Sequence, residues 1–92
     1  MLIRNQIKSA IINLQNISMI FIKEKGYTSY ENKGELTHIF HICTHVNNRD
    51  ELVFLGDYST VEKAMKVLDM IQSNYERRWE VFQMPQDNEV EV

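Results

Sequence analysis

The chain has 92 residues, which is enough for one domain with a single small core. Its 10 Lys and Arg residues and 13 Asp and Glu residues leave a formal charge of −3, and such a chain lacks the clustered cations that hold a nucleic-acid backbone. One cysteine excludes an internal disulfide, and no apolar run reaches the ~20 residues of a membrane span. We therefore expect a cytoplasmic protein with neither a nucleic-acid nor a membrane partner.

The N-terminal quarter of the chain is rich in isoleucine and is interrupted by breaks that contain Asn or Ser. This pattern favours short strands, because β-branched side chains suit a pleated sheet and Asn and Ser suit turns. A helix over residues 7–22 stays open as the alternative, since several of its apolar residues also have helical spacing. The strands that we expect here are 2–4, 10–14 and 17–23, with a turn at 5–9.

A hairpin is predicted in the middle of the chain. Residues 24–35 are polar and contain two glycines, which indicates a loop or the tip of a hairpin. Residues 36–46 read as one long strand, and the Asn-Asn-Arg-Asp sequence at 47–50 is a strong turn signal. The return strand begins at Glu51 and ends near Gly56, and the two strands are expected to pair in antiparallel orientation.

The clearest predicted element is a helix at about 60–77. Ser59 and Glu62 have the spacing of a capping box, in which the Ser59 hydroxyl accepts a hydrogen bond from the backbone N–H of Glu62. Apolar residues then recur at intervals of three and four, which is typical of an amphipathic helix. The stripe consists of Val61, Ala64, Met65, Leu68, Ile71 and Tyr75.

A last strand is expected at 79–84, with Trp79 and Phe82 in the core and Pro85 ending it. The final residues, 86–92, carry three acids and are expected to form a disordered tail. The fold class is therefore a single α+β domain over residues 1–85. In it an antiparallel sheet of five or six short strands, with room for strong curling, is covered on one face by the helix.

His41, Cys43 and His45 alternate along the long predicted strand, so they share one face of it. Imidazole and thiolate groups bind zinc or copper, but the outer two of three ligands on one strand lie ~13 Å apart, too far to share an ion. The face can equally be a polar sheet surface or a protomer contact. No nucleophile elbow, phosphate loop or paired-cysteine motif is present, so we expect no catalytic residues, no bound metal and no cofactor.

Three segments together resemble a known group of proteins. They are the opening Ile3-Arg4-Asn5-Gln6, the run from Leu55 through Tyr58 and Thr60 into Ala64, Val67-Leu68-Asp69 and Ile71, and the late Val81-Phe82-Gln83-Met84-Pro85. The pattern resembles small, mostly uncharacterised proteins encoded by Firmicutes phages and integrative mobile elements. The resemblance implies a small accessory protein that inhibits or sequesters a host defence component, and it carries over no catalytic residue.

The expected function is therefore non-catalytic binding through a protein surface, with a host protein as the partner and a homodimer as a further expectation. Tyrosine is a common anchor in protein contacts, and two tyrosines lie in the polar loop. One alternative is a homo-oligomer that sequesters a small anion with arginines, and the other is a metal module using the His41, Cys43 and His45 face. The partner-binding candidates are Tyr27, Tyr30, His41 and His45, and the ligand-binding candidates are Arg4, Arg77 and Arg78.

Overall fold

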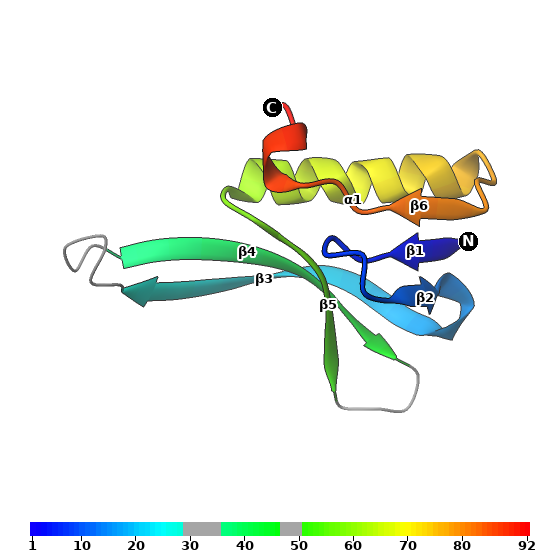
Figure 1. The fold of residues 1–92 in the computed structure, drawn as a ribbon, viewed down its shortest axis with the longest axis horizontal. Helices are drawn as coiled ribbons and strands as arrows, with labels where there is room; N and C mark the ends of the chain where they lie inside the picture. The colour runs from blue at the N-terminus through cyan, green and yellow to red at the C-terminus, as the bar shows by residue number, and fades with distance from the viewer. Residues whose placement is uncertain (29–35, 47–50) are drawn as a thin grey trace.

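The computed structural model describes residues 1–28, 36–46 and 51–92. Within these ranges the protein has six strands, in two three-stranded sheets, and one α-helix, α1, that lies along the body (Figure 1). The strands are β1 (Leu2–Arg4), β2 (Ile11–Asn13), β3 (Ile17–Thr28), β4 (Leu36–Val46), β5 (Leu52–Tyr58) and β6 (Val81–Gln83). The helices are α1 (Val61–Glu76) and the 3-10 turns η1 (Leu14–Asn16) and η3 (Asp87–Glu89).

The α+β class is confirmed, but the expected single antiparallel sheet is wrong. The strands form two sheets, in the orders β2-β1-β6 and β3-β4-β5. The first sheet is mixed, because β1 pairs antiparallel with β2 and parallel with β6. The parallel pair places Ile3 beside Phe82, and both side chains are buried. Burial of these two side chains stabilises the pairing of the last strand with the first.

The N-terminal segment forms strands, so the alternative of a helix over 7–22 is wrong. The turn before β2 is built by Asn5, whose side-chain oxygen accepts from the backbone N–H groups of Ser9 (2.8 Å) and Ala10 (3.1 Å). Asn competes with regular structure in this way because its short side chain reaches nearby backbone groups. Lys8 completes the turn with a positive φ of 63°.

The hairpin of β3 and β4 projects from the body as a long arm (Figure 1). The predicted strand at 36–46 is confirmed, and its antiparallel pairing with the return strand is confirmed as well. The loop predicted from residue 24 is wrong for its first part, because β3 continues to Thr28. Pairing with β4 supplies the backbone hydrogen bonds that let the charged segment at 23–25 stay extended.

Helix α1 is confirmed within one residue at each predicted end, but its cap is different. Thr60 is the N-cap residue, and its hydroxyl accepts from the backbone N–H of Lys63 at 3.2 Å. Ser59 instead donates its hydroxyl to the carboxylate of Asp87. The buried face of the helix carries Ala64, Val67 and Ile71.

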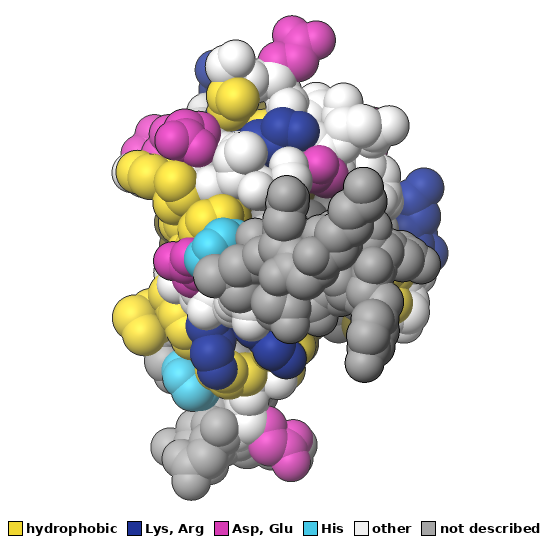
Figure 2. Space-filling model, turned by 90° about the vertical axis from the view of Figure 1, so that its left-hand side faces the viewer, with side chains coloured by type: hydrophobic (Ala, Val, Ile, Leu, Met, Phe, Trp, Pro, Cys, Tyr) yellow, Lys and Arg dark blue, Asp and Glu magenta, His cyan; other side chains and the backbone are white. Residues whose placement is uncertain are grey.

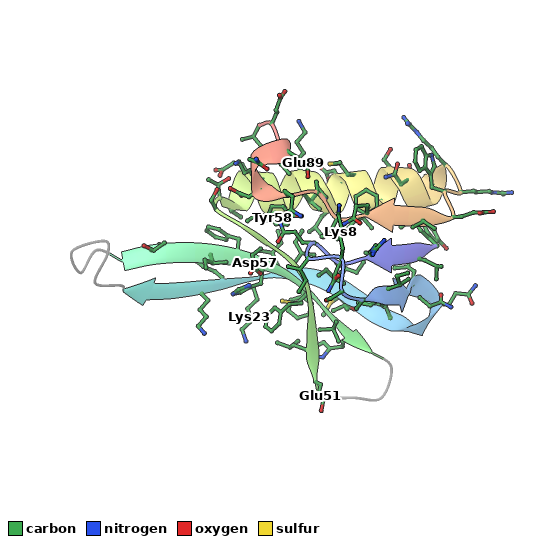
Figure 3. The ribbon with its side chains drawn as sticks, viewed as in Figure 1. Lys8, Lys23, Glu51, Asp57, Tyr58 and Glu89 are labelled. Atoms are coloured by element: carbon green, nitrogen blue, oxygen red, sulfur yellow. The ribbon has the colours of Figure 1, made fainter. Side chains whose placement is uncertain are left out.

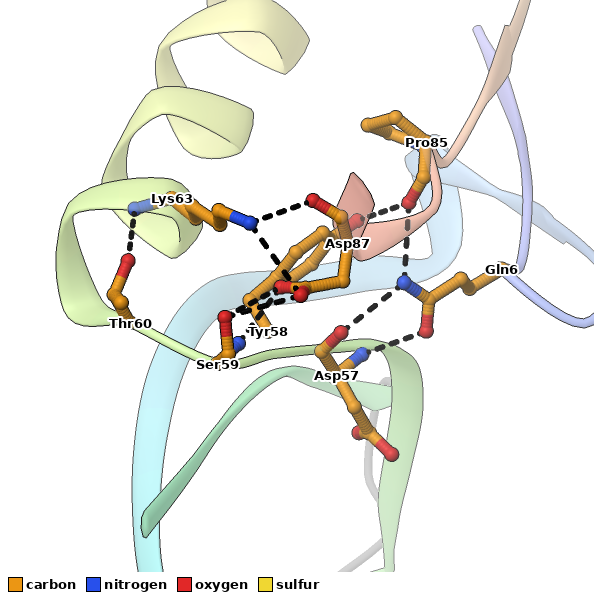
Figure 4. A network of polar contacts seen from close by, with 8 residues as sticks. All are labelled: Gln6, Asp57, Tyr58, Ser59, Thr60, Lys63, Pro85 and Asp87. Carbon is orange, nitrogen blue, oxygen red and sulfur yellow. Dashed lines mark hydrogen bonds and ion pairs between the residues drawn. The ribbon is translucent and has the colours of Figure 1, made fainter. Parts of the chain in front are cut away.

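The C-terminal segment packs on the body and is not the disordered tail that its acids suggest. The Asp87 carboxylate accepts from the backbone N–H of Ser59 at 2.8 Å and lies 3.4 Å from the Lys63 ammonium (Figure 4). Val90 is buried in the core. One apolar side chain and one capping carboxylate therefore fix a segment whose composition is otherwise that of a solvated end.

A single core joins the two sheets and the helix. Trp79 is not part of it, although Phe82 is, because the Trp79 side chain is largely exposed. Among the described residues, no helix has both the length and the apolar character that crossing a membrane requires. The buried members of the core are Ile3, Ile42, Leu55, Tyr58, Ala64, Val67, Ile71, Phe82, Met84 and Val90.

Candidate functional site

The sheet β3-β4-β5 has one face on the core and one face away from it. We call the second the outer face. The register across the three strands arranges its residues in three rows, because residues directly opposite one another in antiparallel strands lie on the same side. The rows are Met19, His45 and Leu52; Phe21, Cys43 and Phe54; and Lys23, His41 and Asp57.

Side-chain contacts confirm that five of these residues share a face, and strand register places the other four. The His41 Nδ1 atom lies 2.6 Å from an Asp57 carboxylate oxygen, and the His41 ring meets the Phe54 ring edge-on with centroids 4.9 Å apart. The Phe21 ring stacks on the His45 ring at 5.5 Å. Figure 3 shows the Lys23 side chain on the side of β3 that lies away from α1. The histidines therefore link the aromatic and charged members of the outer face.

A β-bulge in β5 sets which residues reach the outer face. The pairing with β4 shifts between Ile42 and Cys43, so that Cys43 lies opposite Phe54 while Ile42 lies opposite Gly56. Leu55 is the extra residue, and it is buried in the core. The bulge therefore presents both Phe54 and Asp57 on the outer face, although they are three residues apart.

The outer face exposes apolar side chains, whereas a sheet that turns one side to water usually presents polar residues there. Met19 is 54% exposed and Phe54 is 49% exposed. Ile7, in the turn between β1 and β2, is also exposed and lines a small hollow of about 120 Å³ with Phe54 and Asp57. Figure 2 views the molecule from the end that carries the projecting hairpin. Hydrophobic, histidine and charged side chains lie next to one another at this end.

Cys43 lies in the middle of the outer face but is completely buried beneath its neighbours. Burial raises the pKa of the Cys43 thiol, and the nearby charge of Lys23 acts in the opposite direction. The thiol is therefore neutral at physiological pH, and a neutral, enclosed thiol is a poor nucleophile. It acts as a small apolar side chain that fills the space between Phe21 and Phe54.

The three residues of the metal alternative do not converge. His41 pairs with Asp57, His45 stacks on Phe21, and Cys43 stays protonated beneath them. No group of three or more His, Cys, Asp or Glu side chains in the described part of the chain is placed to hold a metal ion. The outer face has the chemistry of a contact surface, with apolar side chains bordered by charges.

The sequence-predicted partner residues are only partly brought together. His41 and His45 both lie on the outer face. The backbone of Tyr27 lies near the far end of the arm, where it pairs with Thr37, and Tyr30 falls outside the described residues. Three further residues of the face were missed by sequence analysis, namely Met19, Phe54 and Asp57. Phe54 and Asp57 lie on or next to the predicted return strand, which was the available signal. The bulge that brings both to one face has no local sequence pattern, so their shared side could not be predicted.

The three candidate arginines lie at different ends of the small sheet. Arg4 ends β1, and its guanidinium donates to the backbone oxygen of Lys8 at 3.1 Å. Arg77 and Arg78 follow α1, just before β6, whose first residue pairs with Leu2 at the opposite end of β1. The structure therefore does not gather Arg4 with the other two arginines into one cation cluster.

Another hollow lies at the C-terminal end of α1. Two adjoining concavities, of about 340 and 510 Å³, share Met1, Gln15 and Tyr75 in their walls. Arg78 and Trp79 line the larger one, together with Glu76 and Glu80. The carboxylates of Glu76 and Glu80 balance the positive charges of Arg78 and the Met1 amino group, so the lining has no excess of positive charge to hold the small anion of the sequestering alternative.

Comparisons with protein-family models, with curated proteins and with solved structures find no match to this chain.

Proposed function

We propose that the protein is a non-catalytic binding module that engages a partner protein through the outer face. The observation that carries the proposal is the exposure of Met19 and Phe54 beside His41, His45 and Asp57. Aromatic and Met side chains surrounded by polar groups are the usual composition of a protein contact. The neutral, enclosed Cys43 supports a binding role over a catalytic one.

The partner we propose is a host protein, and binding would block or sequester it. This part of the proposal rests on the resemblance to proteins encoded by Firmicutes phages and integrative elements. A sheet face with a firm backbone suits such a role, because side chains held by strands lose little conformational entropy on binding. The projecting arm of β3 and β4 (Figure 1) continues the same sheet as far as the backbone pairing of Tyr27 with Thr37.

The test compares two double variants that each replace two apolar side chains of similar fractional exposure. Met19→Ser with Phe54→Ser alters the outer face, whereas Ile11→Ser with Val81→Ser alters the other sheet. Ile11 is 59% exposed and Val81 is 49% exposed, so the second pair is a matched control. We expect tagged wild type and the control to capture the same Firmicutes protein from lysate, and the Met19/Phe54 variant to lose it.

Three further measurements make the test decisive. Circular dichroism must show that both double variants fold. The captured protein, once purified, should bind the wild type directly and bind the Met19/Phe54 variant at least about tenfold more weakly, the scale set by losing one or two contact anchors. Equal binding by the folded Met19/Phe54 variant would reject the outer face as the site. A double Tyr27→Ala, Tyr30→Ala variant tests whether the site includes the end of the arm.

A further inference from the structure

The charges of the outer face are arranged so that they complement a second copy of the same face. Lys23 lies on one edge strand, β3, and Asp57 lies on the other, β5, with His41 between them on β4. We propose that the outer face packs against the outer face of a second copy, about a two-fold axis that runs parallel to β4. The inference rests on the proposed function and concerns its regulation, because the dimer hides the surface that the partner needs.

The symmetry determines which residues meet. A two-fold axis between two facing sheets, parallel to their strands, exchanges the β3 side with the β5 side but keeps each position along the strand. The row of Lys23, His41 and Asp57 therefore meets the same row of the second copy. Lys23 lies opposite Asp57 of the second copy and Asp57 lies opposite its Lys23, which gives two pairs of opposite charge.

The apolar rows complement themselves under the same axis. Phe21 lies opposite Phe54 of the second copy, and Met19 lies opposite Leu52. Facing sheets pack ~10 Å apart, the distance at which such side chains interdigitate. The two most exposed apolar side chains of the face, Met19 and Phe54, would both lose contact with water.

Other symmetric arrangements fit less well. An axis across the strands would set the charged row of Lys23 against the row of Met19, and so bury charge against apolar side chains without a partner. Association along the free edge of β3 is also unfavourable. An antiparallel pair of β3 strands centred on their charged segment puts Lys23, Glu24 or Lys25 opposite itself.

The expected dimer is weak. Without the buried Cys43, the eight remaining side chains of the outer face cover less than the ~800 Å² per partner of a standard interface. We therefore expect a dissociation constant of roughly 10–100 µM. A weak dimer suits a regulated surface, because a partner with more contacts can displace the second copy.

Sedimentation equilibrium of the wild-type protein and its charge variants tests the arrangement. Lys23→Asp and Asp57→Lys each bring like charges together in the dimer, and we expect each to weaken it about tenfold. The double variant Lys23→Asp with Asp57→Lys restores opposite charges across the interface and should recover most of the affinity. Arg77→Asp and Glu62→Lys make the same changes of charge at the two ends of α1, outside the rows of the outer face, and should leave the dimer unchanged.

Each outcome decides the inference. A wild type that stays monomeric well above the expected dissociation constant overturns it, and so does a Lys23→Asp variant that dimerises like the wild type. If Asp57→Lys does not fold, Phe54→Ser replaces it, because losing the Phe21 contact should abolish the dimer. A monomeric wild type that still captures its partner leaves the proposed function standing. A dimer rescued by the double swap, combined with partner capture that ignores Met19 and Phe54, overturns the proposed function and the regulatory role of the dimer but leaves the dimer itself standing.

Discussion

At the scale of single residues, the Gln6 side chain makes the hydrogen bonds that a neighbouring strand would make with its backbone. Its amide oxygen accepts from the backbone N–H of Asp57 at 2.9 Å, and its amide nitrogen donates to the backbone oxygens of Asp57 and Pro85, both at 3.1 Å (Figure 4). Its own backbone N–H donates to Leu55 at 2.8 Å. One side chain thus joins β5 to the C-terminal segment and satisfies the edge of β5 beside the outer face.

We expect Gln6→Ala to lower the free energy of unfolding by about 1–3 kcal/mol, because three hydrogen bonds are lost and two backbone groups of Asp57 are left to water. Urea denaturation followed by circular dichroism measures the change. Gln15→Ala is the matched control, because Gln15 is exposed on η1, and it should change stability by less than about 0.5 kcal/mol. Equal effects of the two substitutions would contradict the role assigned to Gln6.

Arg78 occupies the backbone position at which a glycine usually ends a helix. Its φ is 60°, and its backbone N–H donates to the oxygen of Tyr75 at 3.0 Å, while the N–H of Trp79 donates to Asn74 at 3.0 Å. These two bonds form a Schellman motif, whose left-handed residue is disfavoured for any side chain with a Cβ atom.

Substitution of the two adjacent arginines should therefore have opposite signs. Arg78→Gly relieves the left-handed conformation and should raise the free energy of unfolding by about 0.5–1 kcal/mol. Arg77, with φ of −82°, gains nothing from glycine, so Arg77→Gly should lower it by a similar amount. Thermal melting of the two variants measures both, and a loss of stability with Arg78→Gly would show that the Arg78 side chain contributes more than its backbone costs.

At the scale of elements, local patterns were sufficient where local energetics decide the structure. The β4 strand and helix α1 were predicted closely, because alternation and helical spacing report burial directly. The cap was assigned one residue early, because Ser59 and Thr60 are both good caps and the choice depends on Asp87, far along the chain. That distant partner has no signature near Ser59.

The parts that were not predictable depend on contacts between distant segments. The parallel pairing of β1 with β6 is fixed by burial of Ile3 and Phe82, which are separated by almost the whole chain. The outer face was only half predicted for the same reason: the parity of β4 identified His41 and His45, whereas the bulge at Leu55 decides which β5 residues join them. The position of a bulge depends on packing on both faces of the sheet, so sequence alternation alone does not locate it.

The contact between the C-terminal segment and the start of α1 should depend on pH. The backbone N–H of Ser59 is the main cause that lowers the pKa of Asp87 below its usual 3.8, aided by the Ser59 hydroxyl and the Lys63 charge. A lowered pKa means that the folded protein favours the carboxylate. The contribution to stability is therefore complete above pH 3.8 and is lost as the pH falls through the folded-state pKa.

Asp87→Asn isolates this contribution. At neutral pH it should lower the free energy of unfolding by about 0.5–1 kcal/mol, a modest value because the Asp87 side chain is 41% exposed and water screens part of the interaction. The difference between wild type and variant should shrink as the pH falls below 3.8. Asn88→Ala is the control, because Asn88 is an exposed neighbour in the same η3 turn and the change adds no titratable group. A difference that does not change with pH would contradict the assignment.

At the scale of the whole molecule, the two sheets are not independent units. Ile3 and Phe82 from the first sheet, Ile42 and Leu55 from the second, and Val90 from the C-terminal segment belong to one buried cluster. Removing either sheet would expose the apolar side chains of the other. The outer face is therefore held in place by contacts that lie on the opposite side of its own sheet, and its shape depends on the whole core.

Unfolding should accordingly be a single cooperative transition. Trp79 precedes β6 and is the one tryptophan in the chain, so its fluorescence follows the first sheet, whereas circular dichroism follows both sheets and the helix. We expect the two signals to give the same urea midpoint, because neither sheet buries its own apolar face alone. Deleting residues 86–92 removes Val90 from the core and should lower the free energy of unfolding by about 2–4 kcal/mol. Both urea midpoints should therefore fall together. Separate midpoints in either protein would mean that the sheet bearing the outer face folds without the first sheet, and the binding surface would then survive substitutions that disrupt the rest of the core.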